Sequence, residues 1–429
     1  MPANATSRLI ARRITVFGGA QAFTVLAAVV RGKVAAFFVG AAGIGLNAVY
    51  QKVAEFIATV AAMGLSFSGI AALSADYASG DAVRLAQGGT RLRRLEVLLA
   101  AAGAVVTVAF APWLSRHFEG DYAHTATYAA LALVVAGLVV SGIELAIVKA
   151  CQQTRRLAWA SILSAALTVV LTVPFYIGLG LSGVIWALVA CTVATAAMSL
   201  WFGHCTLPYR LSGGETWAEL LRAARPMLTL GAVSLATGIA ATGVDLVIQD
   251  YLLAVASKAT VGLYRAGFQM GVGYVSMLFV AVANDYYPRL AAVAHDVRER
   301  NRLATRQGWV QLAFAAGAVA LFEWLAPWLI PLFFSEEFAA AVPMARWAVV
   351  GTFFYALETP LNFLPVVLNR NGHYLGLELA GFVLMCGGAV GGYACGGLSG
   401  SGIGLMLARL LNWLLLYFFC RAAYGFRYR

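Results

Sequence analysis

The sequence has few charged residues. Only 11% of its 429 residues are Asp, Glu, Lys or Arg, and 61% are hydrophobic, whereas soluble globular domains average about 25% charged residues. No polar face repeats along the apolar runs, which excludes a large soluble all-helical protein. The run at 129–148 is apolar on every side, which excludes the period-two alternation of a transmembrane β-barrel. The sequence therefore predicts an all-α polytopic membrane protein.

Residues and motifs that bind metals or cofactors are also scarce. The six cysteines form no CxxC pair and the five histidines have no HExxH spacing, so we predict neither a disulfide framework nor a metal site. The sequence contains no GxxxxGK[ST] stretch, so ATP hydrolysis by this chain is not expected. The glycine-rich run at 396–404 lacks dinucleotide-binding spacing and is interpreted as a tight extracytoplasmic turn. No cofactor is predicted.

Long apolar runs fill most of the chain. Runs of roughly 20 residues bounded by charged or turn residues predict about twelve transmembrane helices. These helices are expected at residues 14–40, 46–74, 94–115, 125–150, 157–178, 181–203, 226–252, 261–287, 307–331, 341–368, 374–395 and 399–421.

Basic residues predict the orientation. If the N-terminus is cytoplasmic, most Lys and Arg residues fall in cytoplasmic loops, and the opposite loops contain Arg116 and Lys258. The positive-inside rule therefore predicts cytoplasmic termini and, for a bacterial chain, location in the inner membrane. The same spread over many loops, rather than in one patch, argues against a nucleic-acid partner despite the net charge of +11.

Short matches recur at a nearly constant offset. "GLSG" at 180–183 returns at 397–400 and "IGL" at 44–46 corresponds to "VGL" at 261–263, both offset by 217; "APWL" at 111–114 returns at 326–329, offset by 215. Such recurrence indicates duplication. A six-span unit repeats with the same orientation, which predicts two six-helix lobes around a central cavity. The expected lobes are 1–210 and 226–429, joined by a cytoplasmic linker at 211–225.

Several charged residues fall inside predicted spans. A cation at the bilayer centre costs about 2.5–3.5 kcal/mol on insertion scales, so such residues are expected to face water, a partner or a substrate. The candidate cavity cations are Arg31, Lys33, Lys52, Arg265 and Arg409, and the candidate ion-coupling acids are Glu55, Asp245 and Glu358. The alternative is internal pairing, of Lys52 with Glu55 by i, i+3 spacing and of Arg409 with Glu358 across helices.

The run at 29–81 ("VVRGKVAAFFVG…ADYASGD"), its counterpart at 259–296 ("ATVGLYRAGF…AAVAHD") and the polar hinge "CQQTRRLAW" at 151–159 resemble the Wzx-type polysaccharide lipid flippases. These belong to the multidrug/oligosaccharidyl-lipid/polysaccharide exporter superfamily. The resemblance implies a cationic cavity that binds the pyrophosphate of an undecaprenyl-linked sugar. The first, second and eighth helices would contribute its basic residues. The matching positions are Arg31, Lys33, Lys52 and Arg265.

The resulting hypothesis is a flippase that translocates an undecaprenyl-pyrophosphate-linked oligosaccharide, of O-antigen or common-antigen type, by alternating access. It would use a coupling cation, H⁺ or Na⁺, and would work beside a glycan polymerase and glycosyltransferases. One alternative is a cation-coupled multidrug antiporter, which favours an acidic cavity. The other is a membrane glycan ligase, which needs an acid or base on a sizeable extracytoplasmic loop.

Overall fold

The computed structural model describes residues 19, 23–208, 216–273, 286, 289–290, 293–294, 296–368 and 370–428. Across these residues the secondary structure is helical, with no strand. Within them, seven helices are long and apolar enough to cross a membrane, or up to eight if a bent pair counts as one span. The prediction of an all-α polytopic membrane protein is therefore confirmed. The predicted spans at 14–40 and 261–287 lie partly outside the described residues.

The chain divides into two compact units. The first comprises Met1–Val39 and Val49–Thr242, and the second comprises Gly40–Ala48 and Gly243–Arg429. Helix α8 (Trp217–Val255) contributes to both units. Of the predicted linker at 211–225, residues 211–215 lie outside the described part, and residues 217–225 form the first turns of α8.

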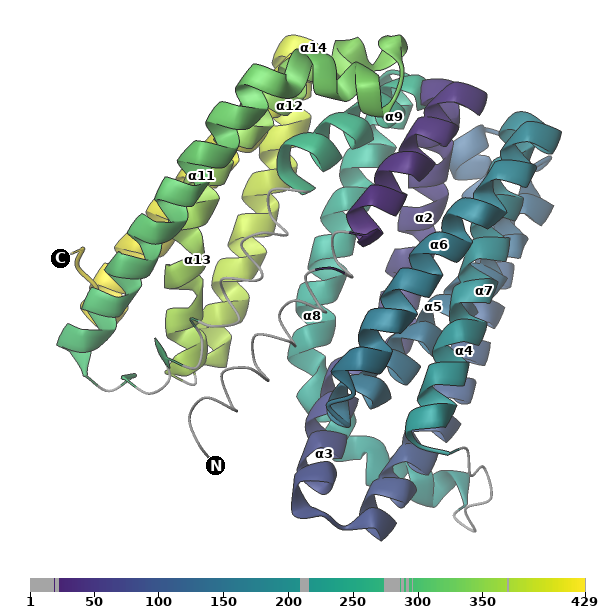
Figure 1. Ribbon diagram of the computed structural model, residues 1–429, viewed down its shortest axis with the longest axis vertical. Coiled ribbons are helices and arrows are strands. Elements are labelled where there is room, and N and C mark those ends of the chain that lie inside the picture. The colour runs from purple at the N-terminus through teal and green to yellow at the C-terminus, as the bar shows by residue number, and fades with distance from the viewer. Residues whose placement is uncertain are drawn as a thin grey trace. The chain divides into compact units, whose positions relative to one another are not determined.

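The first unit is a bundle of long helices (Figure 1). A helix covers residues 23–38. It is followed along the chain by α2 (Gly40–Ala62), of which the part from Val49 onward belongs to this unit. The remaining helices are α3 (Leu65–Ser79), α4 (Ala82–Glu119), α5 (Thr125–Ala150), α6 (Thr154–Leu179) and α7 (Gly183–Thr206). Helix α5 contacts α3, α4, α6 and α7. This central place fits its sequence, because a helix that is apolar on all sides is buried on all sides.

The predicted span at 46–74 is broken into α2 and α3, which meet at an angle of 46°. The break lies at Met63 and Gly64, where φ is +50° and +69°. Gly64 packs closely against α8, since a Cβ built on it would lie 2.2 Å from the carbonyl oxygen of Gly231. Glycine is suited to this position because it tolerates positive φ and allows close backbone approach.

The second unit contains α9 (Lys258–Phe268), η2 (Gln269–Gly273), α11 (Val297–Phe333), η3 (Glu336–Ala341), α12 (Val342–Val350), α13 (Thr352–Val367) and α14 (Asn371–Tyr424). Helix α14 is interrupted by non-helical backbone at Gly396 and Gly397. A Cβ on Gly392 would lie 2.2 Å from the carbonyl oxygen of Gly400, and one on Gly388 would lie 2.3 Å from that of Gly404. The two arms therefore form a tight antiparallel hairpin, and they carry the predicted spans 374–395 and 399–421.

Helices α4 and α11 begin in the same way. The Oδ1 atom of Asp81 accepts hydrogen bonds from the amides of Val83 and Arg84, and Oδ1 of Asp296 accepts them from Arg298 and Glu299. Such N-caps satisfy backbone donors that the helix itself leaves free. The two caps are 215 residues apart, the offset of the repeated "APWL" motif within the same two helices.

Candidate substrate-binding and coupling charges

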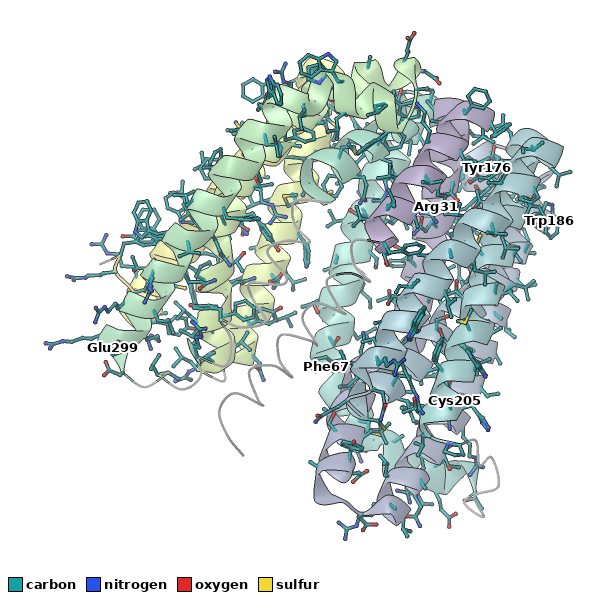
Figure 2. The ribbon with its side chains drawn as sticks, in the orientation of Figure 1. Arg31, Phe67, Tyr176, Trp186, Cys205 and Glu299 are labelled. Carbon is teal, nitrogen blue, oxygen red and sulfur yellow. The ribbon has the colours of Figure 1, made fainter. Side chains whose placement is uncertain are left out.

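Arg31 and Lys33 lie in the helix at residues 23–38, and both are exposed. Arg31 is within electrostatic range of the buried Tyr176 of α6, near which it lies in Figure 2. Among the described residues, Arg31 forms no ion pair with a carboxylate, whereas Lys33 does take part in a further interaction. Arg31 is thus an exposed cation without a carboxylate partner in the described part of the chain, in a helix at 23–38 whose other charged residue is Lys33.

Lys52 and Glu55 form an ion pair on α2. The Lys52 Nζ atom lies 2.8 Å from Glu55 Oε2, and Gln51 Nε2 donates a 2.7 Å hydrogen bond to Glu55 Oε1. Lys52 is 8% exposed, so its charge needs this partner. The structure therefore shows the internal pairing that the i, i+3 spacing allows.

Arg265 and Asp245 lie in α9 and α8, within the second unit. Both are half-buried, and both are within electrostatic range of the phenol of Tyr264, which is buried. Asp245 takes part in a further interaction. Arg265 forms no ion pair with another residue of the described ranges.

Arg409 and Glu358 join α14 to α13. The Nη1 atom of Arg409 donates a 3.0 Å hydrogen bond to Glu358 Oε2, and its guanidinium carbon lies 4.6 Å from the ring centroid of Tyr355, a cation–π distance. Glu358 is 3% exposed, and its Oε1 atom has no partner at hydrogen-bonding geometry among the described residues, although Asn412 lies beside the carboxylate. The predicted cross-helix pair is present.

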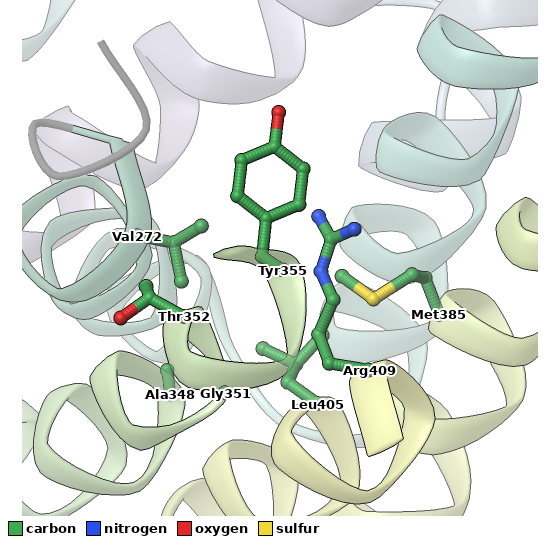
Figure 3. Close-up of a pocket in the computed structure, with 8 residues that line it drawn as sticks. All are labelled: Val272, Ala348, Gly351, Thr352, Tyr355, Met385, Leu405 and Arg409. Atoms are coloured by element: carbon green, nitrogen blue, oxygen red, sulfur yellow. The ribbon is translucent and has the colours of Figure 1, made fainter. Parts of the chain in front are cut away.

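Arg409 and Tyr355 also line a small pocket, shown in Figure 3. Its other lining residues are Val272, Ala348, Gly351, Thr352, Met385 and Leu405. The open space between these side chains, about 10 Å³, is no more than a single water molecule needs, so the pocket in this structure has no room for a ligand group.

A further buried ion pair was not anticipated. Arg93 Nε lies 2.7 Å from Glu144 Oε1 and Nη2 lies 3.0 Å from Oε2, so α4 and α5 are joined by a bidentate contact. The Nη1 atom of Arg93 donates to the carbonyl oxygen of Leu207, at 2.8 Å. Arg93 is 1% and Glu144 0% exposed. The sequence did carry a signal, since Glu144 is the lone acid in an apolar run, where an acid marks a functional or paired site.

The structure thus pairs Lys52 with Glu55 and Arg409 with Glu358, and leaves Arg31 and Arg265 without an acidic partner among the described residues. Arg31, Lys33, Lys52 and Glu55 belong to the first unit; Asp245, Arg265, Glu358 and Arg409 belong to the second. Across the described ranges, no group of three or more His, Cys, Asp or Glu residues could hold a metal ion.

Comparison with known proteins gives the family and the fold. The family model described as "Polysaccharide biosynthesis protein" matches residues 44–343. An inward-facing multidrug resistance MATE family transporter of the MOP superfamily superposes with a TM-score of 0.80 at 15% identity, covering 93% of this chain and 94% of that one. An outward-facing multidrug resistance MATE family transporter superposes with a TM-score of 0.67 at 14% identity, covering 96% of this chain and 94% of that one.

The lipid II flippase MurJ, in an inward closed conformation, superposes with a TM-score of 0.70 at 12% identity and covers 94% of this chain and 87% of that one. No curated protein sequence gives a significant match. The family match confirms the predicted resemblance to proteins of polysaccharide biosynthesis, and the superpositions show that the chain shares the fold of these transporters and of this flippase.

Proposed function

The chain belongs to the polysaccharide biosynthesis protein family, and from this membership we propose that it is a flippase for an undecaprenyl-pyrophosphate-linked oligosaccharide. The repeat unit would be of the O-antigen or common-antigen type. It would cross the bacterial inner membrane by alternating access of two same-orientation six-helix lobes around a central cavity, with both chain termini in the cytoplasm.

One observation carries the proposal: each unit holds an arginine that has no acidic partner among the described residues, Arg31 in the first and Arg265 in the second. Fixed cations in apolar surroundings are costly unless an anion or water compensates them. A lipid diphosphate is such an anion, and its own passage through hydrocarbon requires that its hydration be replaced. Arginine suits this role because its planar guanidinium binds phosphate oxygens in bidentate fashion.

The other candidate cations contribute differently. Lys52 and Arg409 already have carboxylate partners at 2.8 and 3.0 Å. A diphosphate that reached either cation would compete with Glu55 or Glu358 for it. If the diphosphate replaced the carboxylate at Lys52 or Arg409 and the carboxylate later returned, each site would hold the substrate briefly and release it. Lys33 adds a further positive charge two residues after Arg31.

Glu358 is the best placed of the three candidate coupling acids. Its Oε1 atom is buried and has no partner at hydrogen-bonding geometry within the described residues, although Asn412 lies beside the carboxylate. Pro360, in the same helix, cannot donate a hydrogen bond to the carbonyl of Ala356. A carboxylate can bind H⁺, and carboxylate and carbonyl oxygens are ligands of hard cations such as Na⁺. Glu55 and Asp245 are both engaged with other residues and serve as secondary candidates.

A second candidate function is export of organic cations. The multidrug resistance transporter with a TM-score of 0.80 supports it, as does a buried carboxylate, Glu358, within electrostatic range of Tyr355, an aromatic residue that lines the Arg409 pocket. Arg31 and Arg265, which have no acidic partner in the described ranges, count against it, since they repel a cationic drug. A membrane glycan ligase is favoured by none of these features. Glycan polymerases and glycosyltransferases remain the expected partners of the flippase.

The test is complementation of a bacterial strain that lacks its own flippase and therefore lacks surface glycan. Arg31→Ala and Arg265→Ala should each abolish or strongly reduce surface glycan, with membrane levels of the protein unchanged. Arg302→Ala is the matched control because that side chain is 78% exposed and pairs only loosely, at 3.8 Å, with Glu299. Full export by both variants would refute the cationic pathway.

A further inference from the structure

A third charged residue accompanies the Arg93–Glu144 pair. Glu96 lies one turn after Arg93 on α4 and is 1% exposed. Its Oε2 atom is buried and has no hydrogen-bond partner among the residues that the structure describes. Arg93 is already committed, because Glu144 takes two of its donors and the Leu207 carbonyl takes a third. One guanidinium therefore stands among two buried carboxyl groups.

The charge balance of this cluster leaves one carboxyl group without compensation. Arg93 and Glu144 form a bidentate, charge-assisted contact and neutralise each other. An ionised Glu96 would then be a buried, uncompensated anion beside a second carboxylate, an arrangement that is strongly unfavourable. When like charges share a buried site, one of the two carboxyl groups keeps its proton.

We propose that Glu96 is a proton-binding site, and that its proton is exchanged with the cytoplasmic side when water reaches the junction of α4, α5 and α7. On hydration, the carboxyl O–H bond breaks, the proton passes to water, and the carboxylate that forms shares Arg93 with Glu144. On closure, the carboxylate takes a proton back from water. The coupling role of this proton, as the ion whose movement drives transport, rests on the proposed transport function. The binding and release of a proton by Glu96 does not depend on it.

Few charged groups surround the Glu96 carboxyl group, so its proton exchange depends on the Arg93–Glu144 pair. Glu144 of α5 and Arg93 are the charged groups that act on the Glu96 carboxyl. On α3, the nearest acid, Asp76, lies beside Gly88, two turns before Glu96. On α7, His204 is exposed. Thus no cation other than Arg93 acts on Glu96 from the described parts of the packed helices.

The repeat supplies an internal comparison. The offset of 215 that relates the two Asp N-caps and the "APWL" motifs places Glu96 of α4 at the position of Gln311 in α11. Gln311 is also 1% exposed, and both polar atoms of its amide lack hydrogen-bond partners within the described part of the chain. An amide has nearly the shape of a protonated carboxyl group and cannot titrate. The two helices therefore carry side chains of the same shape at this position, and only the one in α4 can bind and release a proton.

Infrared difference spectroscopy of the purified full-length protein tests the site without any substrate. The carbonyl stretch of a protonated carboxylic acid is recorded at neutral pH and again at alkaline pH, in protein labelled with ¹³C-glutamate to assign the signal to Glu. The expected result is a protonated Glu signal that is lost on alkalinisation and is missing in Glu96→Gln. Glu144→Gln should also remove it, because Glu96 then becomes the sole carboxylate of Arg93 and ionises.

The control is Glu358→Gln, which removes the buried carboxyl group of the second unit and must leave the Glu96 signal in place. A Glu signal unchanged in Glu96→Gln would overturn the proposal, and so would its complete absence from the wild type. If Glu96→Gln does not fold, Glu96→Asp takes its place: the ¹³C-glutamate signal must be absent from it, because the aspartate at position 96 carries no label, and persistence of the signal would overturn the proposal. The two proposals are tested independently. A negative infrared result does not contradict the flippase proposal, and a negative complementation result does not contradict proton binding at Glu96.

Discussion

Gly45 of α2 and Gly262 of α9 pack directly against each other. A Cβ on Gly45 would lie 1.8 Å from the carbonyl oxygen of Lys258, and one on Gly262 would lie 2.0 Å from that of Ala41. The contact is reciprocal, because 41 and 258, like 45 and 262, are each 217 residues apart, the offset of the repeated "IGL/VGL" motif. Reciprocal contacts of this kind are typical of elements related by a two-fold axis.

Gly45→Ala and Gly262→Ala should therefore destabilise the protein, by at least the ~1–3 kcal/mol typical of overpacking, because the obstacle is backbone and cannot rotate away. Gly317→Ala is the matched control: it lies in α11 with nothing within 4 Å of its Cβ position, and Ala is the better helix former by about 1 kcal/mol. Thermal melting in detergent measures the effect. Equal melting temperatures for the three variants would contradict the close contact.

Much of the fold could be predicted because hydropathy is local information. The predicted span 125–150 has the bounds of α5, since an uninterrupted apolar run must be either a membrane span or a buried helix. The break between α2 and α3 could not be predicted, because it depends on Gly64 meeting Gly231, a contact between distant parts of the chain.

The charge pairs likewise divide into those that the sequence predicts and one that depends on a contact between distant residues. Lys52 with Glu55 is visible in the sequence as a spacing, and Arg409 with Glu358 was inferred from complementary charge in neighbouring spans. Arg93 lies just before the predicted span 94–115, in a basic run that the positive-inside rule places in a cytoplasmic loop, yet it is 1% exposed and bound to Glu144. Nothing local in the sequence shows that a residue in a basic run turns inward to meet an acid 51 positions later.

The Arg409–Glu358 pair allows a test of structural against substrate-binding roles. Arg409→Met leaves Glu358 buried without its partner and should destabilise the protein by about 3–5 kcal/mol. The double variant Arg409→Met/Glu358→Gln removes both charges and should recover most of that stability. If Arg409 also binds substrate, glycan export in complementation stays low in the double variant. Recovery of both stability and export would assign the pair a structural role only.

The exposure of Arg31 and Lys33 predicts contact with water. In protein whose six native cysteines have been replaced, Arg31→Cys and Lys33→Cys should react with a small charged aqueous thiol reagent. Phe37→Cys is the matched control on the same helix: Phe37 is 76% exposed, and an apolar side chain exposed in a membrane helix is expected to face lipid. Labelling at 37 but at neither 31 nor 33 would place the two cations away from a hydrated pathway.

The nature of the residue at position 31 separates the two transport functions. If Arg31 contacts a lipid diphosphate, Arg31→Ala withdraws a charge-assisted contact of about 1.5–3 kcal/mol, equivalent to roughly a ten- to hundred-fold loss in binding. Arg31→Lys keeps the charge but loses bidentate geometry, and should retain part of the export. Arg31→Glu adds repulsion against phosphate and should export less glycan than Arg31→Ala.

A drug-cation antiporter would tolerate the reversal of charge in Arg31→Glu or benefit from it, because a carboxylate attracts the cation. Surface glycan and drug resistance, measured side by side at matched expression, therefore discriminate: export in the order Arg, Lys, Ala, Glu supports the flippase, and resistance that is kept or raised by Arg31→Glu supports the antiporter.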